Sequence, residues 1–104
     1  MAFQAHDIVT LQTVLRDHRS VVILFNDGSI LTNFAVEPEF DLMSKQSDRI
    51  FFVKVDLNEV PEAQVLAAQN GLATVNFYKH GCLTHSIPGF NLEMVKGALL
   101  QKTV

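Results

Sequence analysis

The chain has 104 residues, of which 48% are hydrophobic, and a formal net charge of −3. This length accommodates a single domain, residues 1–104, without a second core, and the hydrophobic content is too high for a disordered chain. The negative charge argues against nucleic-acid binding, and the apolar runs are strand-sized, too short to span a membrane.

Cysteine content and the first residues bear on the compartment. Cys82 is the only cysteine, so an internal disulfide is excluded and a reducing compartment is the default. Residues 1–7 contain neither a basic region nor a long apolar segment, which argues against a secretory signal. We therefore expect a cytoplasmic protein, and the alternative is a mature secreted chain without its signal.

The first half of the chain alternates between the periods of a helix and of a strand. Apolar residues recur at helical spacing from Ile8, and Asp7 before them is a suitable N-cap. The run 21–25 is entirely apolar, which is typical of a central strand buried on both faces. A second helix is predicted over 30–46, and Pro38 inside it is expected to bend it.

The second half predicts one more buried strand, a short helix, a hairpin and a last helix. Pro61 suits the first turn of the helix after strand 50–55. Strand 74–79 alternates between apolar and polar residues, and the turn His80-Gly81 returns it as strand 82–87. With a short edge strand at 3–5 and a final helix from Asn91, the order is β-α-β-α-β-α-β-β-α. This order predicts an α/β fold with a mixed sheet of four to five strands flanked by about four helices.

Several short motifs, in this order and spacing, resemble thioredoxin over nearly the whole chain. They are Val21–Phe25, Pro38, Phe52–Asp56, Thr74–Phe77, Tyr78–Gly81 and Gly89–Asn91. From Val21 to Gly89 the pattern of that family fits without an insertion or deletion. The resemblance implies a thioredoxin-like fold.

The residues that carry thioredoxin chemistry are replaced. The resemblance places the two cysteines of the Cys-x-x-Cys motif at Ile30 and Asn33, neither of which can attack a disulfide. It places a buried, proton-transferring Asp at Leu24, and a cis-proline at Ala73. Because a cis bond before a non-proline residue costs about 2.5–4 kcal/mol, we expect the Leu72-Ala73 bond to be trans.

These joint losses predict a redox-inactive protein that binds another protein or peptide segment as an adaptor or subunit, with no catalytic residue and no cofactor. The resemblance implies a binding groove that is formed by three loops. Its positions here are Ile30, Leu31, Leu72, Ala73, Thr74, Gly89 and Phe90. Most are apolar, and an exposed apolar patch marks a partner site. The alternative is that Ile30 and Leu31 pack inward and Phe90 caps the last helix.

Cys82 leaves two alternative functions open. It follows a turn and is expected to be partly exposed, so it could be a redox-sensitive thiol or form an intermolecular disulfide. A thiol-dependent redox protein working through Cys82 alone, and a homodimer formed through the groove, are therefore the alternatives to an adaptor. The simplest interpretation is a small strand residue with ordinary reactivity.

Other polar residues are expected to have no chemical role. A metal site at His80, Cys82 and His85 is disfavoured, because structural zinc takes four ligands. The acidic residues of the second helix, Glu37, Glu39 and Asp41, are predicted to lie on different sides of it and to be solvated. His6 and His18 are predicted to be solvated connector residues.

Overall fold

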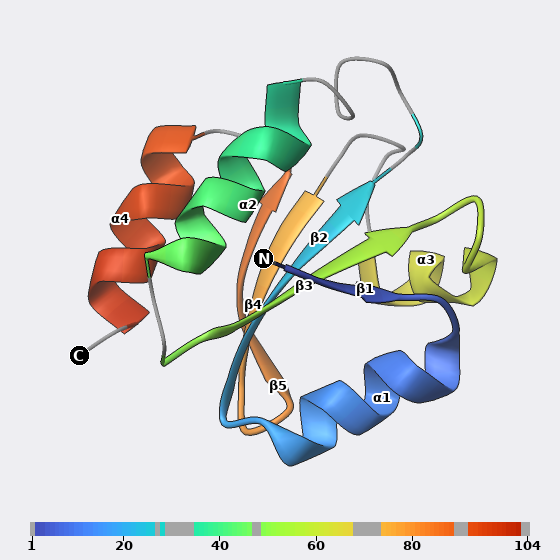
Figure 1. The fold of residues 1–104 in the computed structure, drawn as a ribbon. Coiled ribbons are helices and arrows are strands. Elements are labelled where there is room, and N and C mark those ends of the chain that lie inside the picture. Colours follow the sequence, from blue (N-terminus) through green and yellow to red (C-terminus); the bar gives the residue numbers. More distant parts are fainter. Residues whose placement is uncertain are drawn as a thin grey trace.

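The protein is organised around a mixed β-sheet. The computed structural model describes residues 2–26, 28, 35–46, 49–67, 74–88 and 92–102. Its strands are β1 (Phe3–Ala5), β2 (Ser20–Asn26), β3 (Phe51–Asp56), β4 (Thr74–Lys79) and β5 (Cys82–Pro88). They lie in the order β1-β3-β2-β4-β5 (Figure 1). The first three of these are parallel, and β4 and β5 are each antiparallel to the strand before them. The predicted mixed sheet is confirmed.

Helices cover both faces of this sheet. They are α1 (Ile8–Asp17), α2 (Glu37–Lys45), α3 (Gln64–Ala67) and α4 (Leu92–Lys102). A 3-10 turn at Pro61–Ala63 leads directly into α3. Figure 1 shows α2 and α4 on one face and α1 and α3 on the other. The helices therefore enclose two separate apolar layers with the sheet between them.

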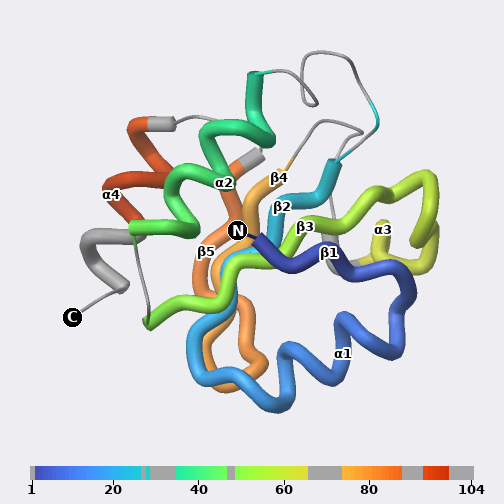
Figure 2. Tube along the Cα trace, viewed as in Figure 1, coloured from blue at the N-terminus to red at the C-terminus, as the bar shows by residue number. Residues whose placement is uncertain are grey.

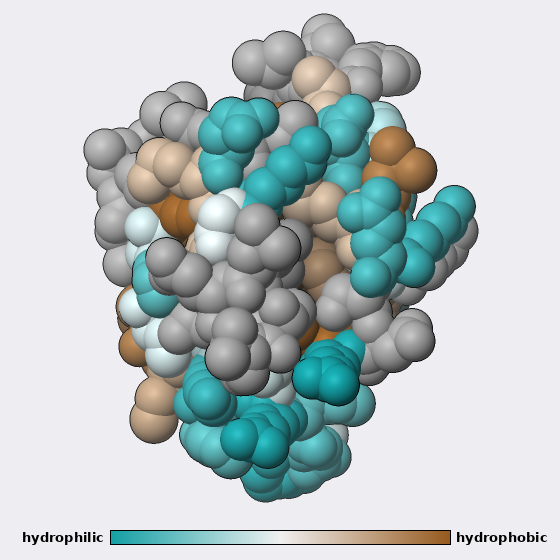
Figure 3. All heavy atoms as spheres, turned by 90° about the vertical axis from the view of Figure 1, so that its left-hand side faces the viewer, coloured by the Kyte–Doolittle hydropathy of each residue, from teal (hydrophilic) through white to brown (hydrophobic). Residues whose placement is uncertain are grey.

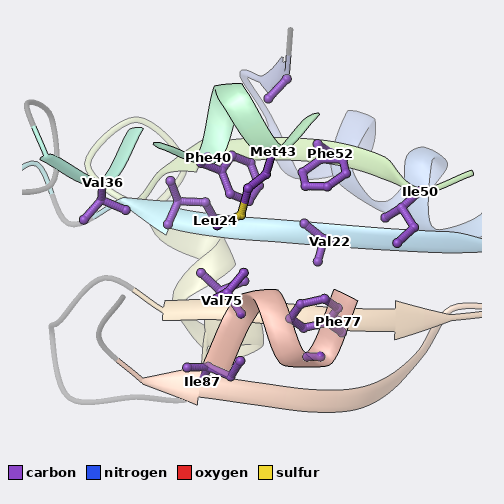
Figure 4. Packing of buried hydrophobic residues seen from close by; sticks show 13 residues of the cluster. Val22, Leu24, Val36, Phe40, Met43, Ile50, Phe52, Val75, Phe77 and Ile87 are labelled. Atoms are coloured by element: carbon purple, nitrogen blue, oxygen red, sulfur yellow. The ribbon is translucent and has the colours of Figure 1, made fainter. Parts of the chain in front are cut away.

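The central strand β2 supplies both layers. Val22 and Leu24 belong to the buried cluster under α2 and α4, which Figure 4 shows. The alternate residues Val21, Ile23 and Phe25 belong to the cluster under α1. All five are at most 2% exposed, so the predicted strand buried on both faces is confirmed. Burying each such side chain stabilises the fold by about 1.5–3 kcal/mol.

Helix α1 begins where the sequence predicts. The Asp7 carboxylate accepts a hydrogen bond from the backbone N–H of Thr10 at 2.7 Å, which confirms Asp7 as the N-cap. This bond is the main cause that lowers the pKa of Asp7 below its usual value. A lowered pKa contributes stability that is present at neutral pH and is lost as the pH falls through that pKa.

The described part of the predicted second helix, residues 35–46, contains Pro38. The α-helical part of α2 begins at Glu37, so Pro38 lies in the first turn of α2, where its missing N–H costs no hydrogen bond. Ala35 and Val36 directly before it form a π-helical turn. The regular helix is thus interrupted next to Pro38, which agrees with the expected effect of the proline. Residues 30–34 of the predicted helix lie outside the described residues.

Strand β4 is more deeply buried than its alternating pattern indicates. Asn76 and Tyr78, the polar row of this pattern, are only 0% and 6% exposed. Their side chains bond to each other: Asn76 Nδ2 donates to Tyr78 Oη at 3.1 Å, and Ser86 Oγ donates to Asn76 Oδ1 at 2.6 Å. Because these polar atoms satisfy one another, the strand can be covered on both faces.

Burial of Tyr78 makes stability depend on pH in alkaline solution. Burial raises the pKa of Tyr78, and the hydrogen bond from Asn76 opposes the shift. Above a pH of about 10, the unfolded chain loses the phenolic proton while the folded chain retains it. We expect the free energy of unfolding to fall as the pH rises through this window, and Tyr78→Phe to remove that part of the decline.

The alkaline prediction can be checked directly, because Tyr78 is the only tyrosine and tryptophan is absent. Near-ultraviolet absorbance then reports the ionisation of one phenol. The titration midpoint is expected to shift downward when the protein is unfolded in urea. Equal midpoints in the folded and unfolded protein would contradict the prediction.

Candidate functional site

Three neighbouring strands, β2, β4 and β5, each have a terminus at the same end of the sheet. The register pairs Phe25 of β2 with Thr74 of β4, and Thr74 with Pro88 of β5. The segments that follow β2, precede β4 and follow β5 therefore leave the sheet from adjacent strands, and Figure 2 shows β2 and β4 side by side there. These are the segments that the predicted groove requires.

The groove itself stays a prediction. Most of its positions lie outside the described residues, namely Ile30, Leu31, Leu72, Ala73, Gly89 and Phe90. Asn33 and the Leu72-Ala73 bond, which we expect to be trans, also lie outside them. Thr74 is described, and it is fully buried at the start of β4. Its side chain thus lies beneath the surface at this end of the sheet.

Leu24 is fully enclosed in the core. It is 0% exposed and belongs to the same cluster as Phe40, Met43 and Val75 (Figure 4). The parallel register places Lys54 of β3 directly beside it. A carboxylate at position 24 would lie among apolar side chains, where its charged form is strongly disfavoured.

The positive charge of Lys54 is balanced by two carboxylates of helix α2. Its Nζ lies 3.3 Å from Asp41 Oδ2 and 3.5 Å from Glu37 Oε1. The Lys54 side chain is only 13% exposed, and the two carboxylates are 26% and 29% exposed. Ion pairs at this depth are screened much less than surface pairs. The three groups form a charge cluster between β3 and α2.

This cluster corrects the prediction for α2. Glu37 and Asp41 were expected on different sides of a solvated helix, yet both point at one lysine. Their spacing of four residues places them on the same face, one turn apart. That spacing is visible in the sequence. The partner is not, because Lys54 reaches them only through the packing of α2 on the sheet.

Asn26 connects this cluster to two loops. Its side chain donates to Glu37 Oε2, and its Oδ1 accepts from the backbone N–H of Gly28 at 2.7 Å. Its main-chain oxygen accepts a hydrogen bond from the backbone N–H of Leu57, the residue after β3, at 2.9 Å. Gly28 has a φ of +83°, and a Cβ there would collide with the Asn58 side chain. The positive φ favours glycine at 28, and a larger residue would also require the exposed Asn58 side chain to move.

Cys82 lies at the other end of the sheet. It is exposed and is the first residue of β5. The register places it level with Lys79 and Ser20, at the start of β2. Asn26, the last residue of β2, is roughly 20 Å from Ser20 along the strand direction. Cys82 therefore lies at the end of the sheet opposite to Asn26 and Thr74.

The two histidines near α1 differ in environment. His6 is exposed, and its Nδ1 lies 3.0 Å from Glu59 Oε2. His18 is half-buried and stacks on Phe51 with ring centroids 4.0 Å apart. The prediction of a solvated connector residue is wrong for His18, because the packing of α1 on β3 brings this aromatic partner from a distant segment.

Neither a membrane-spanning helix nor a metal-binding cluster is found among the described residues. None of the described helices is long and apolar enough to cross a membrane. Among the described residues, no three His, Cys, Asp or Glu side chains gather where they could hold a metal ion.

Comparison with known proteins bears on the fold. No family model and no curated protein matches the sequence. Among solved structures, oxidised thioredoxin from Plasmodium falciparum superposes with a TM-score of 0.89 at 18% identity, over 100% of both chains. Thioredoxin from Malassezia sympodialis gives a TM-score of 0.88 at 20% identity, over 100% of this chain and 92% of the other. The chain has a thioredoxin-like fold.

A thioredoxin variant from Entamoeba histolytica supports the same assignment, with a TM-score of 0.87 at 21% identity over 97% of this chain and 99% of that one. This thioredoxin-like chain nevertheless has a single cysteine. In β2 of this fold, Leu24 is buried beside Lys54, which is paired with two carboxylates of α2.

Proposed function

We propose that this chain is a redox-inactive thioredoxin-like module that binds another protein as an adaptor or subunit. The observation that carries the proposal is the environment of Leu24, which is fully buried in an apolar cluster. The resemblance implies a proton-transferring carboxyl at this place. An apolar residue there can pack but cannot move a proton, and Ile30 and Asn33 provide no thiol.

The charges around Leu24 support the same conclusion. A carboxyl at position 24 would lie beside Lys54, but Lys54 is already paired with Glu37 and Asp41. Its positive charge therefore stabilises α2 against β3. Glu37 and Asp41 thus form ion pairs that hold α2 on the sheet. This role is consistent with a binding module rather than a redox centre.

The proposed binding surface is the degenerate groove. Its three segments leave the sheet from the adjacent ends of β2, β4 and β5. Most of their residues are apolar, and apolar side chains on converging loops suit a segment of another protein. A cytoplasmic location is part of this proposal, since the chain has one cysteine and no internal disulfide.

Redox inactivity is tested by a disulfide-reduction assay with insulin as the substrate and dithiothreitol as the reductant. We expect no acceleration over the uncatalysed rate, because the chain lacks a pair of thiols that could cycle. Turnover that disappears in Cys82→Ser would instead support a redox protein working through its single cysteine. Cys82 lies at the end of the sheet opposite to Thr74, which weighs against that alternative.

Binding is tested by affinity capture with the groove variants Leu31→Asp and Phe90→Asp. Each variant is expected to reduce recovery of a specific partner at least tenfold. Leu83→Asp is the matched control, since Leu83 is 52% exposed and lies near the opposite end of β5. Unchanged recovery with both groove variants would contradict the proposed surface. Size-exclusion chromatography of the same variants shows whether the partner is a second copy of this chain.

A further inference from the structure

Strand β5 forms one edge of the sheet, and among the described strands only β4 lies beside it. It has seven residues, whereas β1 at the other edge has three. The side chains from Cys82 to Ser86 are all exposed. Because successive side chains of a strand point to opposite faces, both faces of this stretch are open. A long, uncovered edge strand is a template for pairing with a further strand.

The main chain of β5 is oriented for such a pairing. Lys79 and Cys82 are paired across the two-residue turn between β4 and β5. The direction of the backbone hydrogen bonds alternates along an antiparallel pair. The N–H and C=O of Leu83, the next residue, therefore point away from β4 toward the open side of the sheet.

Two hydroxyl side chains of β5 are turned inward. Thr84 Oγ1 donates to the main-chain oxygen of Phe77 at 3.1 Å, and Ser86 Oγ donates to Asn76 Oδ1 at 2.6 Å. The outer edge is thus left to main-chain groups. A shift in register near Phe77 and the missing N–H of Pro88 shorten the stretch that can pair regularly, so pairing along this edge is expected to be weak and reversible.

The residues of β5 allow it to pair with an identical strand. None of the residues from Cys82 to Pro88 carries a formal charge with histidine neutral, although many native edge strands carry charged side chains that prevent pairing. Like charges directly opposite each other destabilise a strand pair, and two copies of β5 would avoid this cost. Leu83, which is 52% exposed, adds an apolar contact.

The charges that flank β5 have opposite signs at its two ends. Lys79 lies at the end where β4 turns into β5, and Figure 3 shows hydrophilic residues gathered at the corresponding lower end of the molecule. Helix α4 follows the other end of β5 (Figure 1), and Glu93 is exposed in its first turn. Antiparallel pairing of two copies across a two-fold axis places the Lys79 end of each beside the Glu93 end of the other. These complementary charges favour the antiparallel arrangement.

We propose that β5 pairs with β5 of a second copy of this chain, which continues the sheet across a two-fold axis. Cys82 lies at one end of β5, so the two Cys82 residues come to lie at opposite ends of the paired strands, roughly 15–20 Å apart. A disulfide requires Cα atoms within about 7 Å. The proposed dimer is therefore not covalent, and it does not depend on the partner proposed for the groove.

Self-association is measured by analytical ultracentrifugation from about 10 µM to about 1 mM protein, with and without dithiothreitol. We expect a monomer–dimer equilibrium with a Kd on the order of 100 µM that the reductant leaves unchanged. Backbone amides of residues 82–87 should exchange hydrogen more slowly at the higher concentration. A monomer at the highest concentration, which would leave the edge to a segment of another protein, would overturn the proposal. So would a dimer that dithiothreitol dissociates, or slower exchange confined to other segments.

Charge reversal tests the arrangement of the two copies. Lys79→Glu and Glu93→Lys are each expected to weaken dimerisation about tenfold, and combining them should restore the Kd to within about threefold. Lys45→Glu, at the exposed end of α2, changes the net charge as much as Lys79→Glu and is expected to leave the Kd unchanged. Equal weakening by Lys45→Glu, or a double variant that is no tighter than the single ones, would overturn the antiparallel dimer.

Discussion

Replacing Leu24 with aspartate is expected to lower the free energy of unfolding by about 4 kcal/mol. Removing a buried leucine side chain costs about 2–5 kcal/mol, and burying a polar group without a compensating partner adds to that cost. Leu24 is 0% exposed, so the new carboxyl would have no contact with water. Urea denaturation of both proteins measures the difference.

Lys54 is not expected to rescue Leu24→Asp. It lies beside Leu24 in the register, but its Nζ is paired with Glu37 and Asp41. Burial should then raise the pKa of the introduced carboxyl, so the deficit relative to Leu24→Asn is expected to grow as the pH rises from about 4 to about 8. A deficit that shrinks over this range would show that Lys54 binds the new carboxylate.

Leu24→Met is the packing control for this experiment. A volume-conserving exchange costs less than about 1.5 kcal/mol in most cores. A cost of Leu24→Asp that is no larger than that of Leu24→Met would mean that this site still accepts an acid. Such a result would weaken the argument that the buried proton-transfer group has been replaced by packing.

Replacing Lys54 with methionine is expected to destabilise the protein by about 2 kcal/mol. Breaking a fully buried ion pair costs about 3–5 kcal/mol because one charge stays behind, and the partial exposure of Glu37 and Asp41 reduces this value. Asp41 Oδ1 is also buried, without a hydrogen-bond partner among the described residues. Without Lys54, two carboxylates would face each other under α2.

Two further variants separate the charge effect of Lys54 from lost packing. Lys96→Met removes an exposed lysine of α4 and is expected to change stability by less than about 0.5 kcal/mol. Adding Glu37→Gln and Asp41→Asn to Lys54→Met should restore most of the lost stability, because the repulsion is removed. If the triple variant is no more stable than Lys54→Met, the cluster does not act through charge.

Much of the fold follows from local sequence signals. The all-apolar run 21–25 can only be satisfied by a strand that is covered on both faces, and that is where β2 lies. The order of helix and strand periods predicts the mixed sheet, and Asp7 identifies the start of α1. These signals are local, since each depends on neighbouring residues and on the period of one element.

Which side chains contact one another at Lys54 and at Asn76 depends on tertiary structure. Lys54 meets Glu37 and Asp41 only because α2 packs across β3, and a helix pattern alone does not tell which residue lies opposite. Asn76 is buried because Tyr78 and Ser86 satisfy its polar atoms, although its alternation with apolar residues is that of a half-exposed strand.

By itself, the sequence determined the order of the elements, the buried central strand and the absence of a dithiol, since each is written in residue types and their spacing. Only the tertiary structure decided that the lysine beside Leu24 is paired with two carboxylates of α2, and that Cys82 lies at the end of the sheet opposite to Asn26. The physical reason is strand pairing. It brings together residues that are far apart along the chain, and their electrostatic and packing energies depend on distances that the chain order does not contain.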